Sequence, residues 1–269
     1  MIQRLGYDAA TITDHDFISQ EQVQRARAAA NTIPFITGIE LSSAHQGQTV
    51  HILGFFVDPQ NLELQEYIQK AQDVDRTITE KMLKFLPHSG IQIDIDDLIS
   101  HSLHTYYSMR LVKWVAAELF NNNPSKTLAY FIALHEKIGI NYADFSPWSV
   151  QQAIELIHQA NGIAVLAHPG GAEDKVMRKL DFYYHDKETI EQYLGWGLDG
   201  IETHSPVHNH AESKFYVELA DHFGLLKTAG SDCHGDDPYL GPSLMDKFTD
   251  LYDDQYEKMV QAWKKNQIT

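Results

Sequence analysis

Six side chains of the type that bind metal ions stand at or near the ends of short apolar runs in this 269-residue sequence. They are His15, Glu40, His51, His168, Asp232 and His234. Imidazole and carboxylate together suit Zn, Mn or Fe. A single histidine is more often a structural residue held by hydrogen bonds than a metal ligand. Buried charged groups are costly unless they are paired or metal-bound, so the joint occurrence of the six predicts a multi-metal site.

The apolar runs are interpreted as buried strands, because they are continuous rather than alternating, as in a sheet covered on both faces. They cover residues 7–13, 34–39, 49–57, 163–167, 199–203 and 225–229. Helices are expected at residues 20–31, 149–160, 211–223 and 246–265. This alternation predicts parallel βα units, whose active sites lie at the C-terminal strand ends. All candidates except His51 follow such an end, and the position of His51 suggests a shorter strand.

Residues 60–148 differ from the rest, because their pattern is helical at 62–86, 98–121 and 126–137, with no convincing strand. We therefore expect a helical insertion at 60–148, between two parts of one barrel at 1–59 and 149–269. Ser149 is expected to cap the helix that follows the insertion.

Charge and composition exclude some classes of partner. The formal net charge of −16 argues against binding to long nucleic acid, which relies on Lys and Arg, but permits a small phosphorylated substrate. No stretch has the length of a membrane span and no leader opens the sequence, so no membrane contact is expected. The single cysteine, Cys233, favours a cytoplasmic setting, and we expect it to be a small buried residue rather than a nucleophile.

Side-chain alternation predicts which groups enter the site. Asp232 and His234 are two residues apart, so in an extended chain they face the same side. His15 faces away from Asp14 and Asp16, so one of these two sets enters the site and the other supports it by hydrogen bonds.

The segments around these residues resemble the PHP (polymerase and histidinol phosphatase) family of metal-dependent phosphoesterases. The segments are ITDHD (12–16), ITGIEL (36–41), VHILGFFVD (50–58), AIELIHQANGIAVLAHPGG (153–171), GLDGIET (197–203) and GLLKTAGSDCHG (224–235). They are most similar to the stand-alone members that act on nucleoside monophosphates, 3′,5′-bisphosphates and short oligonucleotide ends. The resemblance implies an α/β fold, a distorted (β/α)7 TIM-like barrel with a helical insertion.

By resemblance, the six residues match the family's metal ligands, and Glu40 matches a carboxylate that is shared between metals. The family uses up to three divalent ions, commonly Mn, Zn or Fe, and the nucleophile is a water activated by them. An Arg-Pro-His segment of the family's insertion clamps the substrate phosphate. Arg110 matches its arginine and Val112 replaces its histidine, although an exposed helix arginine is an equal alternative. His208 matches a polar position that faces the substrate.

The family begins with a strand that carries His-x-His and a Ser-Asp-Gly-like turn, which supply three further ligands. This sequence has neither, and its residues 1–7 resemble the end of the helix that follows them. We therefore expect a barrel that lacks its first strand and binds fewer than three ions. Only the position served by Glu40, His51 and His168 would keep all its protein ligands.

The leading hypothesis is a phosphoesterase that hydrolyses a small, nucleotide-like phosphate monoester. One alternative is an amidohydrolase-type metal hydrolase, although the carboxylated lysine that those barrels usually carry at a strand end has no clear candidate here. The other is a truncated, non-catalytic PHP domain that binds a metal or a phosphorylated metabolite.

Overall fold

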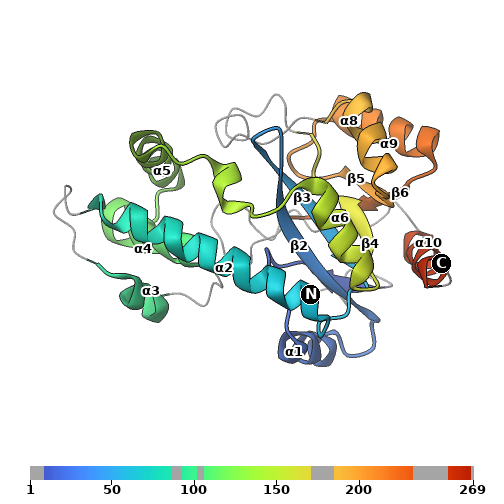
Figure 1. Ribbon diagram of the computed structural model, residues 1–269, viewed down its shortest axis with the longest axis horizontal. Helices are drawn as coiled ribbons and strands as arrows, with labels where there is room; N and C mark the ends of the chain where they lie inside the picture. Colours follow the sequence, from blue (N-terminus) through green and yellow to red (C-terminus); the bar gives the residue numbers. More distant parts are fainter. Residues whose placement is uncertain (1–8, 87–92, 102–105, 171–184, 233–253, 268–269) are drawn as a thin grey trace.

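The computed structural model describes residues 9–86, 93–101, 106–170, 185–232 and 254–267 (Figure 1). Six strands form one sheet in which each strand pairs with the strand before it in the sequence. The strands are β1 (Ala10–Ile12), β2 (Phe35–His45), β3 (Gln48–Phe55), β4 (Ile163–Leu166), β5 (Gly200–His204) and β6 (Leu226–Ala229). The α/β class is confirmed. The (β/α)7 barrel that lacks its first strand stays a prediction.

The direction of β3 differs from the expected parallel arrangement. β1 and β2 are parallel, as are β4, β5 and β6, but β3 runs antiparallel to both of its neighbours, β2 and β4. β2 and β3 are joined by a tight turn in which Gln46 and Gly47 both have positive φ, 52° and 79°. Two positive φ angles in succession are typical of the hairpin turn that suits the twist of antiparallel strands. The prediction of uniformly parallel strands is therefore wrong at β3.

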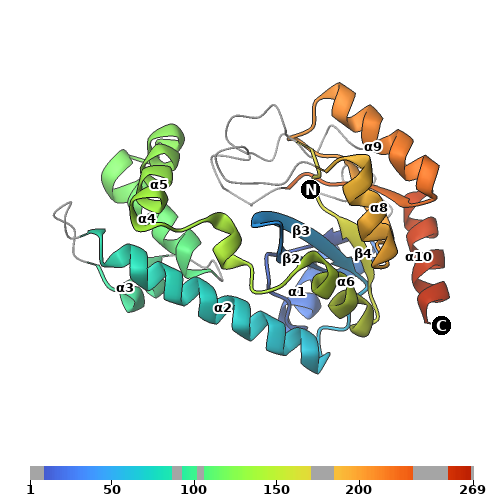
Figure 2. The same cartoon turned by 45° about the horizontal axis from the view of Figure 1, so that its top comes forward.

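Both faces of the sheet are buried, as the continuous apolar runs predict. Along β4, Ala164 and Leu166 belong to one hydrophobic cluster, while Ile163 and Val165 belong to another that includes Met259. Figure 2 shows helices around the sheet. They are α1 (Gln20–Ala30), α6 (Val150–Gln159), α8 (Lys187–Gly195), α9 (His210–Phe223) and α10 (Gln255–Asn266). α8 was not predicted.

The start of α6 was predicted from the sequence. The Ser149 side chain accepts a hydrogen bond from the main-chain N–H of Gln152, and the Gln152 side chain accepts one from the N–H of Ser149. This reciprocal capping box satisfies two of the amide groups that a helix start leaves without intrahelical partners.

The chain between β3 and β4 contributes only helices among its described residues. They are α2 (Leu62–Leu83), α3 (Ile95–His101), α4 (Tyr107–Phe120), α5 (Pro124–Ile138) and a short 3-10 helix, η3 (Tyr142–Phe145). The single helix expected at 98–121 is wrong, because Tyr106 has extended backbone angles and α4 starts directly after it. None of the described helices is long and apolar enough to cross a membrane.

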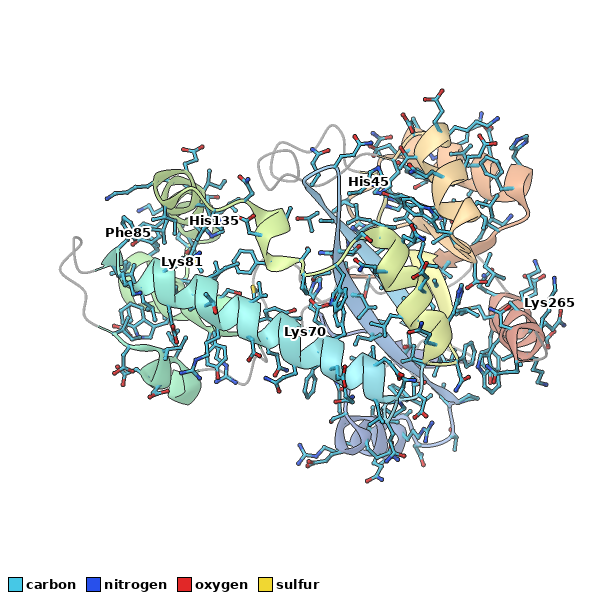
Figure 3. The ribbon with its side chains drawn as sticks, viewed as in Figure 1. His45, Lys70, Lys81, Phe85, His135 and Lys265 are labelled. Carbon is cyan, nitrogen blue, oxygen red and sulfur yellow. The ribbon has the colours of Figure 1, made fainter. Side chains whose placement is uncertain are left out.

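α2 connects two hydrophobic clusters. Tyr67 and Ala71 pack in the cluster of the sheet, whereas Ile78 and Met82 pack in a second cluster with α4 and α5. Figure 3 shows this course, with Lys70 in the middle of α2 and Lys81 towards its end. Because α2 belongs to both clusters, it holds the helical segment beside the sheet.

The N-terminus of α4 is capped by a side chain from α2 rather than by its own N-cap residue, Tyr106, which makes no such bond. Asp75 accepts hydrogen bonds from the N–H groups of Tyr107 at 2.6 Å and Ser108 at 3.2 Å. Burial raises the pKa of Asp75 from 3.8 to about 6, although these hydrogen bonds act in the opposite direction. The buried cap therefore keeps its proton to a higher pH than an exposed aspartate.

Asp75→Asn tests this linkage. Because the folded-state pKa of Asp75 lies above 3.8, its contribution to stability is full at low pH and is lost as the pH rises through about 6. The asparagine keeps an acceptor and never ionises. We expect its stability relative to the parent protein to rise by on the order of 3 kcal/mol between about pH 4 and pH 7.5.

Thermal unfolding at both pH values measures this change. Asp73→Asn is the matched control, because Asp73 lies on the same helix and is exposed. An equal pH response in the two variants would refute the assignment to Asp75.

Candidate metal centre

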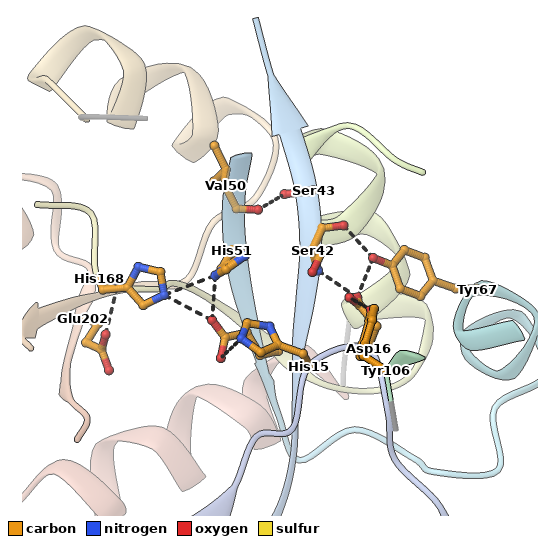
Figure 4. A network of polar contacts seen from close by, with 11 residues as sticks. His15, Asp16, Ser42, Ser43, Val50, His51, Tyr67, Tyr106, His168 and Glu202 are labelled. Carbon is orange, nitrogen blue, oxygen red and sulfur yellow. Dashed lines mark hydrogen bonds and ion pairs between the residues drawn. The ribbon is translucent and has the colours of Figure 1, made fainter. Parts of the chain in front are cut away.

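Three of the six predicted ligands, His15, His51 and His168, converge on the carboxylate of a fourth, Glu40 (Figure 4). Oε1 of Glu40 lies 2.9 Å from His51 Nδ1 and 3.1 Å from His168 Nε2. Oε2 of Glu40 lies 3.9 Å from His15 Nε2. Glu40, His51 and His168 are all buried. The two oxygens of one buried carboxylate thus face different histidines.

The reversed direction of β3 explains why His51 lies inside a strand. In the register of the hairpin, Ser42 pairs with His51 and Glu40 pairs with Leu53. Because β3 runs opposite to β2, its first half lies beside the second half of β2. His51 therefore lies near His15 and His168, which follow parallel strands, and no shortening of β3 is needed. The prediction that Glu40 follows the end of its strand is wrong, because β2 continues to His45 and Glu40 lies inside it.

Main-chain hydrogen bonds fix His15 beside Glu40. The N–H of Asp16 donates to the Glu40 carbonyl at 2.8 Å, and the N–H of Glu40 donates to the Asp14 carbonyl at 3.1 Å. This parallel bridge extends the pairing of β1 with β2 past the end of β1. The His15 side chain consequently points to Glu40, and the carboxylate of Asp16 points elsewhere (Figure 4).

The charges in this cluster depend on one another. Burial raises the pKa of Glu40, but the nearby His15 and the hydrogen bonds from His168 and His51 outweigh burial and hold it well below 4.5. Burial lowers the pKa of His168, but Glu40 outweighs burial and raises it to about 9. Burial lowers the pKa of His51. The carboxylate is therefore ionised and attracts positive charge to the space between the imidazoles.

The donor set fits a divalent metal ion. His51 Nδ1 and His168 Nε2 are 3.2 Å apart, so with Glu40 Oε1 they form a triangle with sides of 2.9, 3.1 and 3.2 Å. Ligand atoms at about 2.0–2.1 Å from an ion are separated by about 3.0 Å in octahedral and about 3.4 Å in tetrahedral coordination. His15, Glu40 and His51 also offer ligand atoms that lie within 4.8 Å of one another. The triangle thus has the dimensions of one face of a coordination polyhedron.

Asp232 lies near this cluster and His234 lies outside the described residues. Asp232 is half-buried with a φ of 46°, and its charge raises the pKa values of both His168 and Glu202. Its carboxylate therefore adds negative charge on the side of His168.

Sequence reasoning missed Glu202 of β5. Its Oε2 accepts a hydrogen bond from the main-chain N–H of His168 at 2.8 Å, which supports the φ of 25° at His168. Its other oxygen leaves no room for a side chain at Gly230, where an added Cβ would lie 2.1 Å away. Burial raises the pKa of Glu202 to about 7. The signal was present as a carboxylate inside the otherwise apolar run at 199–203.

His208, predicted to face the substrate, uses both ring nitrogens for main-chain groups. Nε2 accepts from the N–H of Gly170 at 3.0 Å, so Nδ1 carries the proton and donates to the Thr203 carbonyl at 3.2 Å. Burial lowers the pKa of His208 to about 4, which keeps the ring neutral. These bonds favour a role in bracing two strand ends, and contact with substrate stays a prediction.

Arg110 lies on α4, one turn after Tyr106. Its N–H donates to the Tyr106 carbonyl at 3.1 Å, and its guanidinium lies 5.6 Å from the centre of the Tyr107 ring. The Tyr106 hydroxyl donates a hydrogen bond to Asp16, which follows His15 in the chain. The helix that carries Arg110 thus begins next to the strand end that carries His15.

A buried carboxylate among imidazoles at the strand ends of an α/β sheet is typical of metal-dependent hydrolases.

No family model matches the sequence. Three curated relatives are similar to most of it. The phosphoribosyl 1,2-cyclic phosphate 1,2-diphosphodiesterase of Eggerthella lenta is 26% identical over 234 residues, 86% of this chain and 84% of the relative.

The 3′,5′-nucleoside bisphosphate phosphatase of Chromobacterium violaceum is 28% identical over 83% of this chain and 75% of its own length. The 5′-3′ exoribonuclease of Haemophilus influenzae is 24% identical over 85% of this chain and 80% of its own length. All three relatives act on phosphate esters, so the chain is similar to phosphoesterases, although the relatives differ in the ester that they hydrolyse.

Two solved structures share the fold. A crystal structure from Bifidobacterium adolescentis, assigned as a metal-dependent phosphoesterase, aligns with a TM-score of 0.77 and 20% identity over 97% of this chain and 87% of that one. An amidohydrolase from Chromobacterium violaceum with bound sulfate aligns with a TM-score of 0.66 and 23% identity over 88% and 82% of the two chains. At these identities the likeness concerns the fold alone.

His168→Ala tests the triangle of ligand atoms. The variant removes one vertex, and we expect its affinity for Mn²⁺ to fall by at least about 100-fold, since loss of a group that only supports a ligand already costs about 10–100-fold. Titration calorimetry and elemental analysis measure the change. His222→Ala, at an exposed position on α9, is the matched control and should bind Mn²⁺ like the parent protein. Unchanged binding in His168→Ala would remove His168 from the site.

Proposed function

We propose that this chain is a metal-dependent phosphoesterase that hydrolyses a small, nucleotide-like phosphate monoester with metal-activated water. The observation that carries the proposal is the triangle formed by Glu40 Oε1, His51 Nδ1 and His168 Nε2. Its dimensions suit a divalent ion such as Mn, Zn or Fe. The similarity to three hydrolases of phosphate esters supports the choice of bond.

The proposed ligands are His15, Glu40, His51, His168, Asp232 and His234. Glu40 is proposed to be shared by two metal positions, because one of its oxygens faces His51 and His168 while the other faces His15. Bound divalent ions lower the pKa of water and neutralise charge on a phosphate, so no side-chain nucleophile is required. The protein's part is to hold the ligands in place and to orient the phosphate.

The helical segment 60–148 is proposed to be an insertion in a TIM-like barrel, and to form the substrate side of the site. Arg110 is its proposed phosphate-binding residue. A guanidinium can bind two phosphate oxygens at once, and a cation is needed in a chain with a formal net charge of −16. The start of α4 beside Asp16 supports this placement.

The proposal is tested with purified protein and added Mn²⁺. Phosphate release from AMP, from a nucleoside 3′,5′-bisphosphate and from an aryl phosphate is measured, and a bis-aryl phosphate tests diester hydrolysis. We expect release from at least one nucleotide monoester, and its loss in His168→Ala. Hydrolysis of the diester alone would change the substrate class.

Metal content measured on the same sample separates the alternatives. Two or three equivalents with turnover support a hydrolytic site. Near one equivalent without any phosphate release would contradict the enzymatic proposal and indicate a metal-binding domain that lacks turnover.

Arg110→Ala should weaken substrate binding without loss of metal. Removal of a charge-assisted contact to phosphate is expected to lower kcat/KM by about 10–100-fold. Lys113→Ala on the same helix is the matched control, because it removes the same charge at another half-buried position. An equal decrease in both variants would indicate a general effect of charge, and no decrease in Arg110→Ala would rule out this clamp.

A further inference from the structure

Asp16 is a fully buried carboxylate that follows the candidate ligand His15 directly and points away from the His15 side chain (Figure 4). Its φ of 44° lies in the left-handed region, which separates the direction of its side chain from that of His15. Oδ1 of Asp16 accepts a hydrogen bond from the N–H of Ser42 on β2 at 2.7 Å. Asp16 therefore ties the strand end of His15 to the strand that carries Glu40.

Two tyrosines from the helical segment complete the Asp16 cluster, defined here as Asp16, Ser42, Tyr67 and Tyr106. The Tyr67 hydroxyl of α2 lies 2.8 Å from Asp16 Oδ1 and 2.6 Å from the Ser42 carbonyl oxygen, so its single proton is shared between them. The Tyr106 hydroxyl donates to Asp16 Oδ2. Burial, and then the charge of Asp16, raise the pKa values of both tyrosines well above 10, so both stay donors.

The composition of this cluster points to a task beyond stability. In the described part of the chain, no lysine, arginine or histidine forms an ion pair with Asp16, and its hydrogen-bond donors are one amide and two neutral hydroxyls. Burial of a charge costs hydration, and here only neutral hydrogen-bond donors compensate for that cost. What such a group does provide is a defined geometry, here between a strand end and two helices.

The hydroxyl of Tyr106 is the connection between that strand end and Arg110. Tyr106 is the N-cap residue of α4, and its carbonyl accepts the N–H of Arg110. Asp75 accepts the N–H groups that follow Tyr106, and the Tyr106 hydroxyl donates to Asp16. Movement of the Tyr106 main chain would displace Arg110 with it.

We propose that Asp16 and Tyr106 are positioning residues whose hydrogen bond sets the place of Arg110 relative to His15 and Glu40, and thereby the affinity of the site for a phosphate group. This inference rests on the proposed function for the class of substrate. Neither residue touches the reacting atoms, and both act through their neighbours.

The experiment compares the parent protein, Tyr106→Phe, Arg110→Ala and the double variant, all loaded with Mn²⁺. Inorganic phosphate is the probe, and its dissociation constant is measured by calorimetry together with KM and kcat for AMP. Tyr106→Phe is expected to weaken phosphate binding and raise KM by about 10-fold, with kcat and metal content retained. In the Arg110→Ala background, Tyr106→Phe is expected to weaken phosphate binding by less than about 2-fold, because the guanidinium that Tyr106 positions is absent.

Tyr130→Phe is the matched control. Tyr130 lies on α5 and packs against Phe120 and Phe131, so removal of its hydroxyl tests the loss of a tyrosine oxygen elsewhere in the helical segment. It should leave phosphate binding unchanged. Asp16→Asn weakens the same bond from the other side and should reproduce the Arg110-dependent loss if Tyr106→Phe folds poorly.

A metal-free measurement complements these assays. In urea unfolding without added metal, Asp16→Asn and Tyr106→Phe should be non-additive, because they remove the two halves of one bond. Additive losses would overturn the inference. So would equal effects of Tyr106→Phe on phosphate binding with and without Arg110, or no phosphate binding by the parent protein.

The two proposals fail in different ways. If no phosphate ester is hydrolysed but phosphate binding still shows the Arg110-dependent loss, the enzymatic proposal fails and the positioning role stands. If AMP is hydrolysed equally well by Tyr106→Phe and the parent protein, the positioning role fails and the enzymatic proposal stands.

Discussion

Glu40 brings a negative charge into the interior of the sheet, where a carboxylate is stable only if positive charge or hydrogen-bond donors compensate for lost hydration. The compensation comes from three histidines that belong to three separate segments. Each segment must place its histidine level with Glu40 along the strands, so that the imidazole can reach the carboxylate. The bridge at His15, the register of β3 and the left-handed backbone at His168 all serve that requirement.

The position of Glu40 also explains why two further carboxylates, Glu202 and Asp16, lie in the interior near it. Once His168 is drawn towards Glu40, its main-chain N–H must be satisfied in the interior, and Glu202 accepts it. Asp16 satisfies the N–H of Ser42 on the opposite side of β2. Hydrogen-bonded supporting groups of this kind are usual around metal sites. Here they extend from the surroundings of Glu40 to the helical segment, where Tyr67 and Tyr106 bind Asp16.

Much of this arrangement could be predicted from local patterns. The strands β4, β5 and β6 lie within a residue or so of their predicted ranges, since short buried runs with clear boundaries leave little choice of structure. His15 and His168 follow strand ends, as the rule for parallel strands predicts, whereas Glu40 and His51 lie inside β2 and β3. His15 and Asp16 point in opposite directions, as predicted, but the cause is the left-handed backbone at Asp16 rather than the alternation of an extended chain.

What escaped prediction depends on tertiary context. The direction of β3 rests on a two-residue turn at Gln46 and Gly47, and only its glycine is typical of such a turn. The break before α4 depends on Asp75, which lies far away in the sequence and supplies the cap that Tyr106 lacks. Glu202 was missed because it lies inside a buried strand, and the role of a charged residue there depends on which group it contacts in the folded protein.

The order of the strands has a consequence for how the chain is made. Each strand pairs with its predecessor, so the sheet can grow from the N-terminus as the polypeptide leaves the ribosome. The hairpin of β2 and β3 brings Glu40 and His51 together at once, but His168 follows His51 by 117 residues. During synthesis Glu40 and His51 are therefore made well before His168, which follows α2 to α6 and β4 in the chain. The length of the helical segment thus determines how long after Glu40 and His51 the third partner, His168, is synthesised.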